Sequence, residues 1–141
     1  MNNLEEILRE SFCKYKSSNK NAKLYIEVPV FARSVDLVEL VEGKLYAVEF
    51  KIRDWKRALN QLKSVESCFD YLVLCIPKPK TEKCRRNIIS TCASLGIGLY
   101  FWDQENDLFF HECQEKCVHD IWQIQKRQTL SYLEKQEAQN E

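Results

Sequence analysis

The spacing of apolar residues changes several times along the chain, and each change predicts a new structural element. Apolar residues recur every three or four positions from residue 3 to 16, which predicts an amphipathic helix. The runs 69–77 and 97–102 are continuously apolar, which is typical of strands buried on both faces. The expected order is a helix at 3–16, a strand at 24–31, two strands within 35–52, a helix at 55–67, a strand at 69–77, a helix from a cap at Thr81 to about Ser94, a strand at 97–102, a turn at 103–107 with a short returning strand, and a helix at 115–133.

Residues 35–52 are expected to form a hairpin that brings three charged residues together. Glu42–Gly43 interrupts the apolar run and suits a two-residue turn with a positive φ at the glycine. That turn places Asp36 directly opposite Glu49, and the alternation of strand side chains puts Lys51 on the same face. A longer loop or a bulge would shift the register and separate the pair.

Both faces of this hairpin carry apolar side chains, so the two carboxylates are expected at the rim of a core. Opposed like charges destabilise a sheet pair by roughly 0.2–1 kcal/mol. A divalent cation would relieve that repulsion, because hard cations bind carboxylate oxygens. The alternative is a charged strand end without a function. Strict alternation assigns Val38, Leu40, Leu45 and Ala47 to the face of Asp36, and Val35, Leu37, Tyr46, Val48, Phe50 and Ile52 to the other.

The length and charge of the chain limit its organisation and its partners. With 141 residues it is expected to form one domain, residues 1–134, followed by a polar tail, 135–141, that frays. The formal net charge is zero, which argues against tight non-specific DNA binding. The charges are uneven, however, because 51–57 and 78–86 are basic and 103–120 is acidic.

The seven cysteines are odd in number and lie in apolar segments, which favours reduced thiols in the cytoplasm over a disulfide framework. No apolar run is long enough to span a membrane, and the first residues lack the features of a secretory signal. His111, Cys113, Cys117 and His119 could supply four nitrogen or sulfur ligands for zinc, although buried thiols and solvent-facing histidines are the interpretation we favour. Glu27, in an apolar strand, either faces solvent or points toward Asp36 and Glu49.

The predicted order, together with Asp36 and the run Glu49-Phe50-Lys51, resembles the PD-(D/E)XK nuclease superfamily, nearest its Holliday-junction resolvase and RecB-like branches. The resemblance covers residues 3–102, and Val35 stands where the motif name has proline. It implies an α/β fold with a restriction-endonuclease-like αβββαβ core, a mixed sheet flanked by helices, and an extra C-terminal helix.

The resemblance also implies a metal-dependent DNA endonuclease that hydrolyses phosphodiester bonds. Mg²⁺ or Mn²⁺ would be held by Asp36, Glu49 and the backbone carbonyl of Phe50, and Lys51 would orient or deprotonate the attacking water. Two further catalytic residues are suggested, a glutamine on the following helix and a glutamate on the first helix. In this chain these are Gln61 and Glu5, with Glu5 preferred to Glu6.

The partner expected from the resemblance is DNA, bound through its phosphates, with a homodimer or a protein partner supplying specificity. The alternative is a catalytically silent module of the same fold that binds DNA or assembles with proteins. The residues expected to hold phosphates are Arg53, Lys56, Arg57, Lys83, Arg85 and Arg86.

Overall fold

The structure is a computed structural model that describes residues 2–140, and its elements follow the predicted order. The cap expected at Thr81 is confirmed, and Asp54 and Gly96 occupy the N-cap of α2 and the C-cap of α3. The elements are α1 (Asn3–Lys16), β1 (Ala22–Val30), β2 (Arg33–Val41), β3 (Lys44–Phe50), α2 (Trp55–Ser64), the 3-10 helix η1 (Glu66–Cys68), β4 (Tyr71–Pro77), α3 (Glu82–Leu95), β5 (Gly98–Asp103), β6 (Leu108–Cys113) and α4 (Gln123–Asn140).

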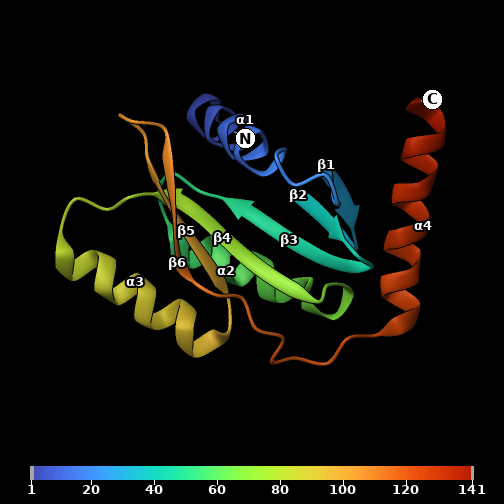
Figure 1. Ribbon diagram of the computed structural model, residues 1–141. Coiled ribbons are helices and arrows are strands. Elements are labelled where there is room, and N and C mark those ends of the chain that lie inside the picture. The colour runs from blue at the N-terminus through green and yellow to red at the C-terminus, as the bar shows by residue number, and fades with distance from the viewer. Residues whose placement is uncertain (1, 141) are drawn as a thin grey trace.

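The strands form one six-stranded mixed sheet in chain order, which confirms the α/β class (Figure 1). β1, β2 and β3 are antiparallel neighbours, β3, β4 and β5 run parallel, and β6 returns antiparallel to β5. α2 and α3 each connect two parallel neighbours. Right-handed connections that advance in one direction across a sheet put both helices on the same face.

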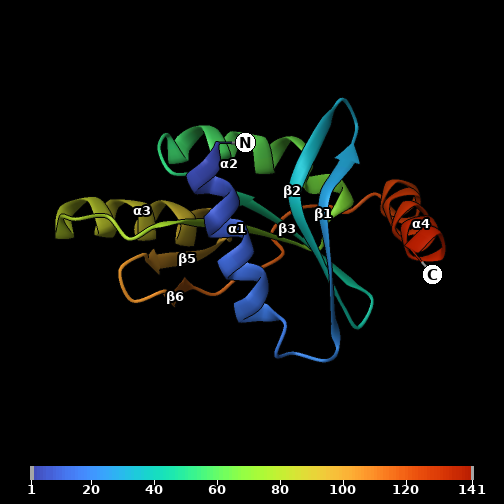
Figure 2. The ribbon, with the colours of Figure 1, turned by 90° about the horizontal axis from the view of Figure 1, so that it is seen from above.

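Helix α1 covers the opposite face of the sheet, which it crosses in Figure 2. Leu8 and Phe12 are fully buried there, and the Phe12 ring lies 5.5 Å from Phe50 and 5.2 Å from Tyr100, centroid to centroid. Only part of the predicted apolar face of α1 is therefore buried in the core. Its outer members, Ile7 and Tyr15, remain 43% and 45% exposed.

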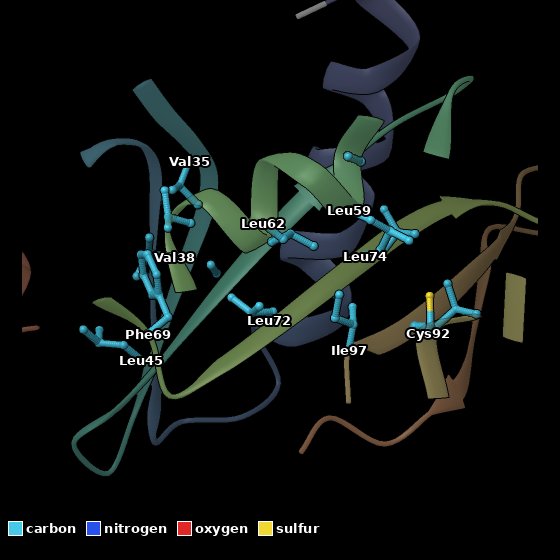
Figure 3. Close-up of a cluster of buried hydrophobic side chains, with 14 of the residues drawn as sticks. Val35, Val38, Leu45, Leu59, Leu62, Phe69, Leu72, Leu74, Cys92 and Ile97 are labelled. Atoms are coloured by element: carbon cyan, nitrogen blue, oxygen red, sulfur yellow. The ribbon is translucent and has the colours of Figure 1, made fainter. Parts of the chain in front are cut away.

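The larger core lies between the sheet and the layer of α2 and α3. Leu59 and Leu62 of α2 lie over the strand that carries Leu72 and Leu74 (Figure 3). Ile88 and Cys92 supply the buried side of α3, as the apolar spacing of that helix predicts. This core fixes the ends of β3 and β4, beside which the candidate site lies.

The turn of the hairpin is confirmed, but the assignment of faces at its open end is wrong. Val41 pairs with Lys44, and Glu42 and Gly43 have φ values of 50° and 78°. Val35, expected on the face of Leu37, is fully buried in the core under α2 and α3 together with Val38. The alternation of faces fails because the strands are irregular between these residues.

Two helices differ from their predicted bounds. α2 ends at Ser64 rather than 67, because the chain tightens into η1. α4 begins at Gln123 rather than near residue 115, because the segment before it crosses the end of the sheet in a non-helical conformation (Figure 1). Backbone hydrogen bonds hold this segment, from Lys116 N to Gly96 O at 2.9 Å and from Trp122 N to Ser67 O at 2.9 Å.

The C-terminal residues expected to fray are helical as far as Asn140. Glu137 accepts a hydrogen bond of 2.8 Å from the hydroxyl of Tyr25 on β1, so the last turns of α4 are tied to the edge of the sheet. Leu133 is fully buried and anchors the middle of this helix. No helix within residues 2–140 is both long and apolar enough to cross a membrane.

Candidate functional site

Asp36 and Glu49 meet at the open end of the hairpin, as the register predicts. The regular pairing of β2 with β3 ends at Leu37 and Val48, one position before the two acids. There the side chain of Asp36 replaces the next backbone partner, because its Oδ2 accepts a hydrogen bond of 2.9 Å from the N–H of Phe50. The carboxylate of Asp36 is thereby fixed beside Glu49.

Glu49 is buried, with 4% of its surface exposed, and the charged neighbour that most affects its pKa is another acid, Asp36. Burial is the largest cause that raises the pKa of Glu49 well above its ordinary value, and the hydrogen bond and negative charge of Asp36 raise it further. Arg33 acts in the opposite direction. The pair therefore favours a bound proton or a bound cation over two free charges.

The pairing of β1 with β2 breaks beside this pair. It runs from Ile26–Leu37 to Val28–Val35 and omits Glu27 and Asp36. Glu27 has a φ of 51°, and its side chain is 61% exposed and forms an ion pair of 3.3 Å with Arg9. Of the two interpretations of Glu27, the structure supports the solvent-facing one.

Lys51 follows the end of β3, and its backbone N–H donates to Cys75 O at 3.3 Å. Its side chain lines a cavity of about 260 Å³ together with Ile76 and Ile88, which belong to the core under α2 and α3. Glu49 pairs in register with Leu74 of the same core. Lys51 and Glu49 therefore lie on the same face of the sheet, as alternation predicts.

Glu5 does not join Asp36 and Glu49 as a third acid. Glu5 is 8% exposed on the sheet side of α1, with its backbone N–H capped by Asn2 at 2.8 Å. Within residues 2–140, no three His, Cys, Asp or Glu residues gather closely enough to hold a metal ion. Gln61 is half-buried on α2, and its backbone carbonyl accepts from Arg33 at 3.5 Å.

The expected phosphate-binding residues fall into two groups. Arg53, Lys56 and Arg57 are exposed at the start of α2, and Lys83 and Arg86 are exposed in the first turns of α3. All five are free to contact a ligand in solution.

Arg85 differs from these residues because it is half-buried and its guanidinium holds the Pro79 carbonyl at 2.6 Å. It stabilises the segment before α3, and its assignment as a phosphate ligand has no geometric support.

The four residues with zinc-like spacing do not converge. His111 stacks on Tyr100 with 4.2 Å between ring centroids, and Cys113 is buried with its thiol directed at the Ile89 carbonyl. Cys117 is exposed, and His119 contacts the Phe69 carbonyl at 2.7 Å. All seven cysteines of the chain are free thiols.

Two features of the site were missed from the sequence. The first is Arg33, which lies close enough to Glu49 to favour its ionised form; its position three residues before Asp36 is the signal that could have found it. The second is the cavity, because Lys78 and Lys80, at the start of the basic run 78–86, line it beside Lys51. These lysines are far from Lys51 in the sequence, so the sequence alone did not show that they line one cavity with it.

Comparison with protein families and with curated proteins finds no match for this chain. Among solved structures, it is similar to the SPO1766 protein of unknown function from Silicibacter pomeroyi. The TM-score is 0.62 at 12% identity, over 94% of this chain and 85% of that one. At this identity the likeness concerns the fold alone.

Proposed function

We propose that the protein is a metal-dependent nuclease that hydrolyses phosphodiester bonds of DNA at Asp36, Glu49 and Lys51. The observation that carries the proposal is the buried contact between the two carboxyl groups, with an ammonium group two residues beyond. In support, the order α1-β1-β2-β3-α2-β4 agrees with the αβββαβ core of restriction-endonuclease-like proteins. All seven cysteines are free, which fits the cytoplasm as the site of action.

The residues fit Mg²⁺ or Mn²⁺. Mg²⁺ is commonly held by one or two carboxylates and completes its shell with water and substrate phosphate oxygens. Asp36 and Glu49 supply two such carboxylates, and the backbone carbonyl of Phe50, between Glu49 and Lys51, is the third oxygen in the proposal. A cation here would also offset the repulsion that raises the pKa of Glu49.

The chain's own residues then have separate roles in hydrolysis. Lys51 orients the attacking water and stabilises negative charge on the phosphate. The hydrogen bond from Phe50 keeps Asp36 in one orientation, so that the carboxyl pair is organised before a ligand arrives. The cation, when bound, supplies a more acidic water and charge stabilisation at the departing oxygen.

The test is cleavage of plasmid, branched and single-stranded DNA with Mg²⁺ or Mn²⁺. Lys51→Ala should lower the rate on the order of 10²-fold or more, the scale for loss of a group that stabilises transition-state charge. Lys20→Ala, in the exposed turn after α1, is the matched control and should cleave at the wild-type rate.

The second candidate is a silent module of this fold that binds DNA or assembles with proteins, as a homodimer or with a specificity-giving partner. The zero net charge and the lack of a third acid beside Asp36 and Glu49 among residues 2–140 favour it. Wild-type protein that binds DNA but cleaves none of the three substrates would support this candidate and overturn the nuclease.

A further inference from the structure

The cavity beside Lys51 lies where the parallel strands β3 and β4 end. In open α/β sheets, the carboxyl ends of parallel strands are the usual place for a ligand. The cavity extends from the segment after β3 to the first turns of α3, where Cys84 lines it. It therefore connects Lys51, two residues after Glu49, to the basic segment before α3.

The lining of this cavity is strongly cationic. Four basic residues line it, Lys51, Arg53, Lys78 and Lys80, and no acidic residue of the described chain does. None of the four forms an ion pair with an acid of residues 2–140. Because the whole chain has zero formal net charge, this local excess selects for an anionic ligand.

The two lysines of the segment before α3 are presented from a constrained backbone. The N–H of Lys78 donates to Trp102 O at 2.8 Å, and Arg85 holds the carbonyl of Pro79 at 2.6 Å. Pro77 and Pro79 each fix one φ angle. A ligand therefore meets a segment that is already ordered, which lowers the entropy cost of binding.

The rest of the lining is apolar. Trp55, Ile76 and Ile88 contribute to it, and the Nζ of Lys56 lies 5.7 Å from the centroid of the Trp55 ring. A phosphate ion alone would leave these apolar side chains exposed to water. A ligand that joins an anion to a flat apolar ring would cover them, and every nucleobase can stack on an aromatic side chain.

We infer that this cavity binds one unpaired nucleotide of a nucleic-acid strand, with phosphates at Lys51, Lys78 and Lys80 and the base against Trp55. The inference rests on the proposed function, because the strand would continue to Asp36 and Glu49. It narrows the substrate to single-stranded or locally unpaired nucleic acid. At about 260 Å³ the cavity is smaller than most ligand pockets, roughly 300–1,000 Å³, and takes one base rather than a base pair.

The test is binding in EDTA, which excludes cleavage, measured by fluorescence anisotropy of a short labelled oligothymidylate. Lys78→Ala/Lys80→Ala should lower the affinity about tenfold or more and reduce the salt slope by about 0.7 for each lost phosphate contact. Lys14→Ala/Lys20→Ala is the matched control, since it removes two exposed positive charges that lie outside the cavity and have no proposed role in binding. Equal losses in the two double variants would overturn the inference.

Trp55→Leu should lower the affinity for oligothymidylate roughly tenfold, the scale of one base stack, and leave tripolyphosphate binding unchanged. The same oligonucleotide annealed to its complement should bind more weakly than the single strand. Equal affinity for the duplex, or a Trp55→Leu variant that binds like wild type, would show a simple anion site and no nucleotide pocket.

Cys84 gives a readout that does not depend on affinity, because it lines the cavity. Saturating oligothymidylate should slow its alkylation by iodoacetamide several-fold, measured on its peptide by mass spectrometry, while the exposed Cys117 reacts as before. Without such protection the inference fails even if DNA is cleaved. Protection without cleavage would support the pocket and contradict the nuclease.

Discussion

Asp70, just before β4, lies beside the start of β3, and Glu49 lies near the end of β3. The two acids are buried to the same extent, each with 4% of its surface exposed. Asp70 accepts a hydrogen bond of 2.8 Å from the N–H of Leu45 and forms an ion pair of 2.9 Å with Lys126 of α4. Glu49 has another carboxyl group as its partner, that of Asp36. A buried acid is therefore paired with a cation at the start of β3 and with a second acid at its end.

The difference separates a structural acid from a site acid. Buried charges in proteins are normally paired, because burying an unpaired charge lowers the free energy of unfolding by roughly several kcal/mol. Asp70 obeys this rule, and so does Glu39, also buried, with Lys16 at 3.9 Å. Glu49 does not, which is expected where a ligand supplies the missing positive charge. The following predictions test this contrast, from the largest expected effect to the smallest.

Removing the charge should have the largest effect at the Asp70 end. Asp70→Asn leaves Lys126 without its carboxylate partner, and breaking a buried pair typically costs about 3–5 kcal/mol. Glu49→Gln puts a neutral amide in place of a buried acid whose ionisation burial and Asp36 both oppose, so it should leave the free energy of unfolding unchanged or higher. Urea unfolding in EDTA compares the two variants. Similar losses in both would show that Glu49 is a structural acid like Asp70.

Metal should act at the Glu49 end alone. A cation that binds only the folded state stabilises it by mass action, by about 2.7 kcal/mol at a hundredfold excess over Kd. The melting temperature of the wild type should rise with Mg²⁺ or Mn²⁺, and Asp36→Asn/Glu49→Gln should lose the rise. Glu105→Gln, in the exposed turn between β5 and β6, is the control that should keep it. A rise that persists in the double variant would place the cation elsewhere.

This contrast could be predicted from the sequence at only one end of β3. Asp36 and Glu49 lie on a hairpin whose two-residue turn at Glu42–Gly43 fixes the register locally, so the pairing follows from a few neighbouring residues. Asp70 acquires its partner from a helix more than fifty residues later, as shown by the hydrogen bond between Asp70 and Lys126. Sequence spacing contains no signal for that contact.

The same reasoning explains the errors in the fold. Helix α3 was predicted well because its cap at Thr81, its apolar spacing and Gly96 all lie within the element. The start of α4 was wrong because residues 114–122 are held by contacts to distant backbone, such as Ser67 O, which outweigh local helix propensity. The cavity was missed for a related reason, since Lys51 and Lys78 meet only after β3 and β4 pair.

The pH dependence of stability should also differ between the two ends. The pKa of Glu49 is raised from 4.5 to about 9 in the folded protein, first by burial and then by Asp36. Because the folded state then binds the proton more tightly, its contribution is complete below pH 4.5 and is lost as the pH rises toward 9. The slope for one proton is at most about 1.4 kcal/mol per pH unit. Metal-free wild type should therefore lose stability over this range relative to Glu49→Gln, as followed by urea unfolding. Parallel pH profiles for the two proteins would contradict the buried pair.

The smallest effect tests the opposition of the two acids itself. Asp36→Asn keeps the shape of the side chain and an oxygen that can accept from the Phe50 N–H, while it removes one of two facing charges. In EDTA and above pH 9, where both acids are ionised, the variant should be as stable as wild type or more stable, by about 0.5–1 kcal/mol, the scale of a like-charge pair across two strands. Asp36→Ala is the control for the hydrogen bond. It removes the same charge but leaves the Phe50 N–H unpaired, which costs about 1–3 kcal/mol.

The Asp36→Asn variant should therefore be more stable than the Asp36→Ala variant. Because a neutral amide is a poor ligand for a hard cation, Asp36→Asn should also lose the response to Mg²⁺. If Asp36→Asn instead loses as much stability as Asp36→Ala, the charge of Asp36 is being used to hold the fold together, and Asp36 belongs with Asp70 rather than with a metal site.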